Sequence, residues 1–163
     1  MQHRIRKLTF LSLCVALAMI LGYLESLIPF FVGIPGIKLG LSNLVIVWIL
    51  YTYEFKDAIL VNIVRVILNS ILFGNIYSFL FSLSGGIFSL ISMNLFKKFN
   101  FHIYSVSMMG GITHNIAQCM VAILTTSVQM LYYLPVLLVS GLICGIINGM
   151  ITQKITPYLK SVK

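Results

Sequence analysis

Acidic residues are nearly absent from this chain of 163 residues, which has only Glu25, Glu54 and Asp57. With a single aspartate, the chain cannot build an aspartate-rich magnesium site by itself, and no pair of carboxylates lies within an apolar segment. The sequence also lacks a nucleophile elbow, an HExxH motif and a nucleotide-binding loop. We therefore expect no enzymatic activity and no ATP hydrolysis from this chain alone.

Cysteine is also scarce, and Cys14, Cys119 and Cys144 are scattered through separate apolar segments. They form no CxxC motif and no other spacing that metal ligands require. Free cysteines are usually buried as small apolar residues. The sequence therefore predicts neither a metal site nor a bound cofactor.

Charged residues of both signs make up only 9% of the chain, whereas soluble domains carry about 25%. Hydrophobic residues make up 60%, and the mean hydropathy is +1.04. In a soluble protein the net charge of +8 would suggest nucleic acid as a partner. Here the bases flank apolar segments, which is the pattern of a protein embedded in a lipid bilayer.

Six apolar segments follow one another with brief polar turns between them. They cover residues 8–28, 38–53, 57–74, 76–96, 104–127 and 132–153. Each reaches or approaches the roughly 20 residues that cross a bilayer, although the second is short. The first follows a basic stretch but runs too long for a signal peptide and lacks a cleavage site. The sequence predicts an all-α integral membrane protein whose residues 1–163 form one domain of six transmembrane helices.

The basic residues give the orientation of these helices. If the N-terminus is cytoplasmic, Lys38 lies outside, Arg65 lies within the membrane, and the other nine bases lie inside. Those nine are Arg4, Arg6, Lys7, Lys56, Lys97, Lys98, Lys154, Lys160 and Lys163. Cytoplasmic loops are enriched in bases, so we predict a multi-pass protein of the cell membrane with both termini inside. Tyr132 and Tyr133 then fit an aromatic belt at the outer interface.

Arg65 lies near the middle of the third apolar segment, and Asn62 and Asn69 share its face of the predicted helix. A charge at the centre of the bilayer costs at least roughly 2.5–3.5 kcal/mol on insertion scales. Such a charge persists only where it faces a cavity, a partner or a substrate. Arg65 is therefore a candidate binding residue for a ligand with negative charge.

His114, Asn115 and Gln118 cluster in the fifth apolar segment, with His114 and Gln118 four residues apart on one helical face. A lone histidine in such a segment is either a hydrogen-bonded structural residue or, together with Arg65, part of a polar interior. No second histidine or cysteine stands at ligand spacing, so a metal is not predicted here.

Glu25 lies near the outer end of the first segment, and Lys38 follows the next loop. Three alternatives remain open: the two pair with each other, Glu25 neutralises Arg65, or both line the mouth of a ligand pocket with Ser26, Ser42 and Asn43. The predicted substrate-binding set is Arg65, Asn62, Asn69, His114, Asn115, Gln118, Glu25, Lys38 and Asn43.

Small residues recur every fourth position in two segments. In the first they are Ser12 and Ala16, and also Cys14 and Ala18; in the last they are Gly141, Gly145 and Gly149. Small residues at this spacing let membrane helices approach closely, either within one chain or between subunits. We expect Ser12 and Ala16 to dock on a separate membrane subunit and the glycine stripe to pack internally. The pairs Gly85–Gly86 and Gly110–Gly111 indicate close helix crossings or backbone exposed to a ligand.

An ordered set of motifs resembles one protein family along nearly the whole chain. The motifs are GYLESLIP at 22–29, IPGIKLGLSN at 34–43, Arg65 through Phe73-Gly74, FLFSLSGG at 79–86, and Thr113-His114-Asn115 with Gln118. They resemble the Gx transporter family, whose members are also labelled heptaprenyl diphosphate synthase component I.

That family is in turn similar to the substrate-binding S components of energy-coupling factor importers. The resemblance implies six helices, a pocket toward the outer face, and a coupling subunit and ATPase subunits as partners. It implies docking through Ser12 and Ala16, where serine replaces the first alanine of the family's spacing. It also implies a vitamin-like polar or anionic substrate, with a flavin as one candidate. The alternative is a membrane accessory subunit of a heptaprenyl diphosphate synthase.

Overall fold

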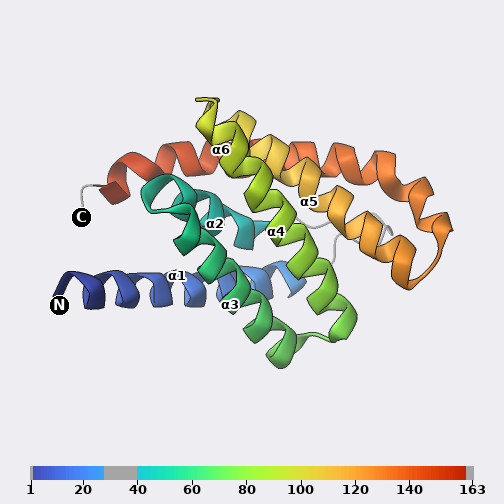
Figure 1. The fold of residues 1–163 in the computed structure, drawn as a ribbon, viewed down its shortest axis with the longest axis horizontal. Coiled ribbons are helices and arrows are strands. Elements are labelled where there is room, and N and C mark those ends of the chain that lie inside the picture. The colour runs from blue at the N-terminus through green and yellow to red at the C-terminus, as the bar shows by residue number, and fades with distance from the viewer. Residues whose placement is uncertain (1, 28–39, 161–163) are drawn as a thin grey trace.

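The computed structural model describes residues 2–27 and 40–160, which are almost entirely helical (Figure 1). The helices are α1 (Gln2–Leu27), α2 (Leu41–Thr52), α3 (Phe55–Phe73), α4 (Ile76–Lys98), α5 (Ile103–Thr125) and α6 (Leu134–Lys160). A short 3₁₀ helix, η1 (Val128–Tyr133), joins α5 to α6. No strand occurs in these two ranges, so the predicted all-α class is confirmed.

The helices coincide with the six predicted segments except at their ends. Two of them extend well beyond the predicted ends: α1 begins at Gln2 rather than at residue 8, and α6 continues to Lys160 rather than ending at residue 153. Both extensions run into basic and polar residues. A hydrophobic run identifies only the part of a helix that lipid or protein covers. Lysine and arginine have about the same helix propensity as leucine, so a helix can continue into basic residues beyond that run.

Within residues 2–27 and 40–160, three helical stretches are long and apolar enough to cross a membrane. The spans are Arg4–Glu25, Ile76–Lys98 and Val128–Pro157. The apolar helix α2 is shorter, and α3 carries Lys56, Asp57 and Arg65. The membrane character of the chain is thus supported, while six spans with both ends inside remain a prediction.

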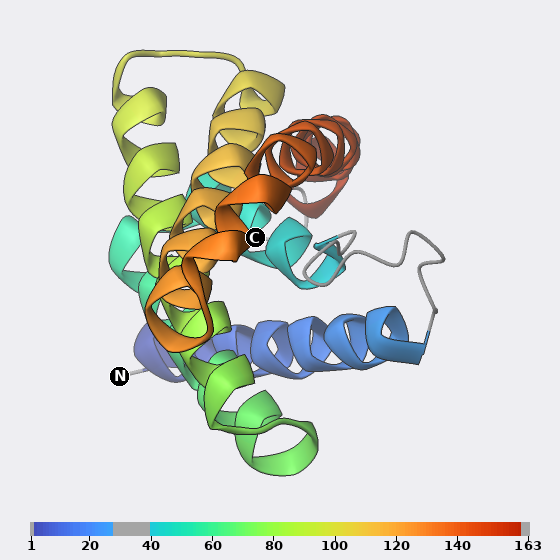
Figure 2. The same cartoon turned by 90° about the vertical axis from the view of Figure 1, so that its right-hand side faces the viewer.

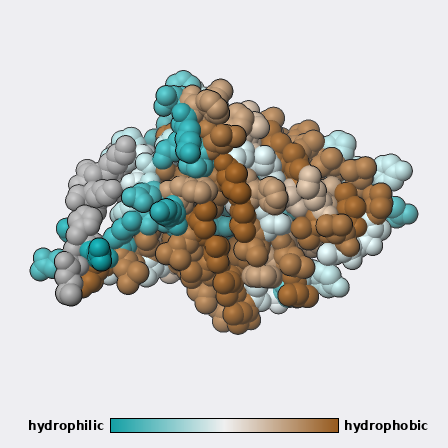
Figure 3. Space-filling view, viewed as in Figure 1, coloured by the Kyte–Doolittle hydropathy of each residue, from teal (hydrophilic) through white to brown (hydrophobic). Residues whose placement is uncertain are grey.

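The surface shows the same division between apolar and polar regions. Hydrophobic side chains cover the middle of the face in Figure 3, and hydrophilic ones gather at its left and upper left. In Figure 1 that region holds the first turn of α1, the end of α6 and the turn between α4 and α5. On α1 alone, Leu8, Leu13, Leu17 and Leu24 are exposed, as expected of a helix that faces lipid or a partner.

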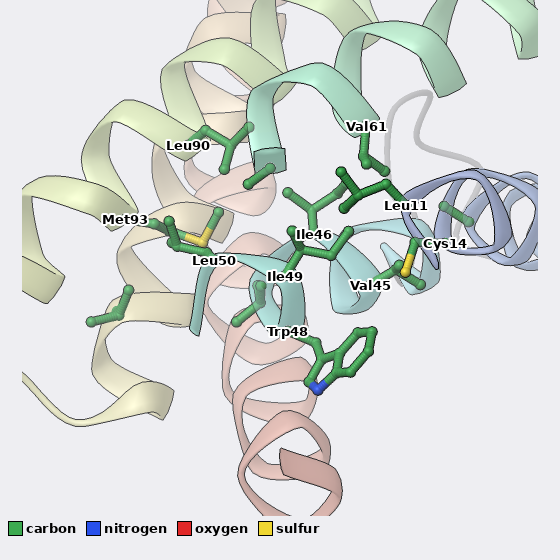
Figure 4. Packing of buried hydrophobic residues seen from close by; sticks show 14 residues of the cluster. Leu11, Cys14, Val45, Ile46, Trp48, Ile49, Leu50, Val61, Leu90 and Met93 are labelled. Atoms are coloured by element: carbon green, nitrogen blue, oxygen red, sulfur yellow. The ribbon is translucent and has the colours of Figure 1, made fainter. Parts of the chain in front are cut away.

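The short helix α2 lies at the centre, between α1 and α6 (Figures 1 and 2). Every residue from Val45 to Leu50 is buried. Figure 4 shows these side chains meeting Leu11 and Cys14 of α1, Val61 of α3, and Leu90 and Met93 of α4. The stretch of α2 from Val45 to Leu50 is therefore covered by the other helices of this chain.

The glycine stripe of α6 packs inside the chain, against α5. Gly141 lies against the backbone of Gly111, and a β-carbon at Gly145 would lie 2.7 Å from both the Met108 Cα and the Ser107 carbonyl oxygen. These neighbours are backbone atoms, which cannot rotate away. The structure therefore supports internal packing of this stripe, as predicted.

Charged side chains join the helices at the end that carries the basic residues. Lys7 of α1 forms an ion pair of 2.9 Å with Asp57 of α3. Asp57 also closes a capping box with Glu54 at the start of α3, and Lys97 of α4 donates to the Leu50 carbonyl at the end of α2. The single aspartate of the chain thus has a structural role.

The predicted topology can be tested by labelling single cysteines in a variant without Cys14, Cys119 and Cys144. A cysteine at Lys98 is expected to react only from the cytoplasmic side, and one at Gln129 in η1 only from outside, since α5 separates them. The measurement is labelling of intact cells by a membrane-impermeant maleimide before and after permeabilisation. Reaction of both positions from one side would contradict the topology.

Because Gly145 lies against the backbone of α5, a larger side chain at this position is expected to destabilise the fold. We expect Gly145→Leu to destabilise the protein by about 1–3 kcal/mol, because the new side chain meets backbone. The control is Val139→Leu on the exposed face of the same helix, which should unfold like the native protein. Thermal unfolding in detergent measures both, and equal melting temperatures would show that the two helices are not closely packed.

Candidate functional site

The guanidinium of Arg65 is buried in the middle of α3, with only 6% of the residue exposed. Its Nε and Nη2 donate to Asn62 Oδ1 at 3.2 and 2.8 Å, and Nη2 also donates to Asn43 Oδ1 of α2 at 2.9 Å. The predicted shared face of Arg65 and Asn62 thus becomes a direct contact. Neutral amide oxygens hold the charge, and within residues 2–27 and 40–160 Arg65 forms no ion pair.

Glu25 lies in the same region but has other partners. Its carboxylate accepts the backbone N–H of Gly40 at 2.6 Å and that of Leu41 at 3.1 Å. It therefore caps the start of α2, where unpaired N–H groups and the helix dipole favour a negative charge. Glu25 does not form the ion pair with Arg65 that was one of the alternatives. Lys38, the other proposed partner of Glu25, lies outside the described residues. Its predicted place at the mouth of the pocket therefore stays a prediction.

A pocket of about 190 Å³ brings most of the predicted site residues together. Its wall includes Glu25 from α1, Asn43 from α2, Arg65 and Asn69 from α3, and His114 and Gln118 from α5. The hydroxyls of Ser42, Ser70, Ser78 and Ser82 add to this wall. The polar residues of five helices therefore converge on one cavity beside the buried charge.

Two asparagine side chains leave polar atoms without partners at this site. Asn69 Oδ1 and Asn62 Nδ2 are buried, and neither has a hydrogen-bond partner among the described residues. Buried polar groups are nearly always hydrogen-bonded, so each such atom requires an explanation. Asn69 lines the pocket, where a ligand or water can donate to its free oxygen.

Glycines create the room that the polar side chains occupy. A β-carbon at Gly85 of α4 would come within 2.9 Å of the His114 ring, and one at Gly86 would overlap the Asn62 amide. A β-carbon at Gly22 of α1 would lie 2.7 Å from Ser42 Oγ. The sequence left two interpretations of Gly85–Gly86, a close helix crossing or backbone exposed to a ligand. The structure supports close packing, in which both glycines lie against the polar side chains of His114 and Asn62.

Asn115 stands apart from the other predicted residues. Its Nδ2 donates to the Leu137 carbonyl at 2.5 Å and to Ser140 Oγ at 3.3 Å, and so it links α5 to α6. It borders a neighbouring cavity of about 50 Å³, whose wall shares Gly40, Asn43, His114 and Gln118 with the Arg65 pocket. The amide of Asn115 thus has a structural role that its sequence position next to His114 did not reveal.

Asn148 of α6 was missed in the sequence. It is buried, and its Nδ2 donates to the Gly40 carbonyl at 3.1 Å. Gly40 has a φ of 71° and packs between Asn148 and Asn43, so only glycine fits there without strain. The available signal was an amide within the glycine stripe of an apolar segment.

The two small-residue pairs of α1 face opposite ways. Cys14 and Ala18 are buried in the core, whereas Ser12 and Ala16 are exposed. The Ser12 hydroxyl bonds back to the Leu8 carbonyl at 3.0 Å, which reduces the polarity of this face. The pair proposed for docking is therefore available to another subunit.

The described residues contain no group of three or more His, Cys, Asp and Glu side chains that could hold a metal ion. The polar pocket instead offers one guanidinium, several amides and several hydroxyls. This set of groups can bind and orient an anionic or polar molecule through hydrogen bonds.

Comparison with known proteins gives one match. A family model described as heptaprenyl diphosphate synthase component I matches residues 14–155, which include every described residue of the Arg65 pocket. No curated protein matches the chain significantly, and no solved structure does. The match covers most of the chain and confirms the family label that the motifs indicated. The chain therefore belongs to the heptaprenyl diphosphate synthase component I family.

Proposed function

We propose that this chain is the substrate-binding membrane subunit of an importer of the energy-coupling factor type, and that it is not itself an enzyme. In this proposal it forms one multi-pass domain in the cell membrane and binds a vitamin-like polar or anionic molecule. The main support is Arg65, a buried guanidinium that lines a polar pocket and has no ion-pair partner among the described residues.

The energetics of Arg65 favour a negatively charged ligand. Removing a guanidinium from water is costly, and amide oxygens recover only part of that cost. Nε and Nη2 are engaged by Asn62 and Asn43, while the structure assigns no acceptor to Nη1 within the described residues. A carboxylate or phosphate would supply both the missing acceptor and the opposite charge.

The position of the pocket agrees with uptake from outside. It extends from Arg65 and His114, near the middles of α3 and α5, to residues near the ends of α1 and α3 and near the beginnings of α2 and α4. In the predicted orientation these ends face the exterior. A flavin remains one candidate substrate, on the basis of the family resemblance.

The proposed partners follow from the exposed pair on α1. Ser12 and Ala16 present a smooth surface to which a coupling subunit can pack. ATPase subunits bound to that coupling subunit would supply the energy, because this chain has no nucleotide-binding loop.

The family description favours a second candidate, an accessory subunit of a heptaprenyl diphosphate synthase. In that case a separate subunit would hold the magnesium and the diphosphates, because the only aspartate here is paired with Lys7. The same exposed face of α1 would then dock the synthase. The two candidates differ in the partner that co-purifies and in the need for Arg65.

Arg65→Ala is expected to weaken binding of the small molecule that co-purifies with the native protein by about ten- to a hundredfold. This corresponds to loss of a charge-assisted hydrogen bond of about 1.5–3 kcal/mol. Arg65→Lys should restore only part of the affinity, because an ammonium lacks the planar fork. The measurement is calorimetric titration in nanodiscs.

The matched control for Arg65 is Lys98→Ala, which removes an exposed positive charge from α4 and should bind normally. Native affinity in a folded Arg65→Ala protein would make Arg65 a structural charge and place the binding site elsewhere.

Ala16→Trp is expected to abolish co-purification with the coupling complex while the subunit stays folded, because the indole fills the exposed surface of α1. Met120→Trp on the exposed face of α5 is the control and should leave the complex intact. The measurement is affinity purification from membranes followed by identification of the bound subunits. Recovery of a prenyl diphosphate synthase in place of ATPase subunits would support the second candidate.

A further inference from the structure

A second, larger cavity adjoins the Arg65 pocket and has no role in the function proposed above. It has a volume of about 370 Å³ and lies between the first half of α4, the last turns of α5, η1 and the start of α6. We call it the aromatic chamber, because Tyr77, Phe81 and Tyr133 line it.

The aromatic chamber and the Arg65 pocket share part of their walls. Ser78 and Ser82 of α4 and Gln118 of α5 line both cavities. The two cavities are therefore direct neighbours. We call them the two halves of the candidate site.

The volumes favour a ligand that occupies both halves. Small-molecule sites usually measure about 300–1,000 Å³ and enclose most of the ligand. The Arg65 pocket, at about 190 Å³, is smaller than this range, whereas the aromatic chamber falls within it. The Arg65 pocket alone suits a charged group, and the rest of the ligand needs the chamber.

The chamber wall indicates the chemistry of that remaining part. Aromatic rings bind flat rings by stacking or edge-to-face contact. The Gln118 amide and the hydroxyls of Ser78, Ser82 and Thr126 line the chamber together with these rings. A hydrocarbon chain would remove these polar groups from water without giving them partners, which is unfavourable. A heterocyclic ring system satisfies both kinds of wall.

We propose that the chamber binds the heterocyclic ring body of the same ligand whose anionic group lies at Arg65. This inference rests on the proposed function and extends it: the substrate class is an anion joined to a flat, hydrogen-bonding ring system. Ala122 of α5 lines the chamber but not the Arg65 pocket, so a large side chain there fills the chamber selectively.

The test uses riboflavin 5′-phosphate as a probe, because it joins a phosphate to a flat heterocycle. Binding to the full-length protein in nanodiscs is measured by quenching of the flavin fluorescence. Ala122→Phe should weaken binding by about tenfold or more, in line with the loss of ring stacking. The control is Met120→Phe, which adds the same side chain on the exposed face of α5. Tyr133→Ala, at a half-exposed position, gives a second chamber variant if Ala122→Phe does not fold.

The outcomes separate this inference from the proposed function. If Arg65→Ala weakens the probe but Ala122→Phe and Tyr133→Ala do not, the chamber is no subsite and the anion site stands. If only the chamber variants weaken it, the role of Arg65 is overturned. Failure of the native protein to bind the probe would overturn the ring-body assignment. The ring-body assignment would also be overturned if geranyl diphosphate, which carries a hydrocarbon chain in place of the ring, bound more tightly than riboflavin 5′-phosphate.

Discussion

A guanidinium that forms no ion pair with any described residue organises the polar half of this protein. Arg65 is buried within an apolar helix, and the oxygens of Asn62 and Asn43 hold it in place. Asn43 belongs to α2, whose first turn is fixed by Glu25 of α1 and by Asn148 of α6 through Gly40. Hydrogen bonds therefore link α1, α2, α3 and α6 around one charge. The carboxylate nearest to Arg65 in this network is bound by backbone N–H groups, so the charge is left facing the cavity.

The two halves of the molecule are stabilised by different kinds of interaction. Around α2 the contacts are apolar, from Leu11 and Cys14 on one side to Met93 on the other. Toward the pocket, glycines replace larger side chains, and the space that they free is taken by polar groups such as His114 and the Asn62 amide. A packed core at one end thus supports a polar cavity at the other.

Much of the fold and part of the site could be predicted from the sequence, because both depend on local periodicity. The helical repeat placed Asn62 beside Arg65, and hydrophobic runs located all six helices. The partner of Glu25 could not be predicted, because a backbone N–H group has no signature in the sequence. Asn148 was overlooked because the glycines around it predict only packing. The sequence predicted Tyr133 to be part of an interfacial aromatic belt. The structure places it in η1, where it also lines a cavity. Periodicity specifies the face of each helix, but the contacts between helices depend on the whole tertiary arrangement.

In the predicted topology, in which α3 spans the membrane, the contact between Arg65 and Asn62 also bears on how the chain enters the bilayer during synthesis. A helix that is inserted alone must carry its charge through an apolar phase, at a cost of roughly 2.5–3.5 kcal/mol on insertion scales. Asn62 lies three residues before Arg65 on the same helix, so the acceptor enters together with the charge. Asn43 has already been synthesised by then, whereas the pocket walls on α4 and α5 follow later. In that topology, the order of the residues along the chain gives the guanidinium an acceptor before the cavity beside it has been assembled.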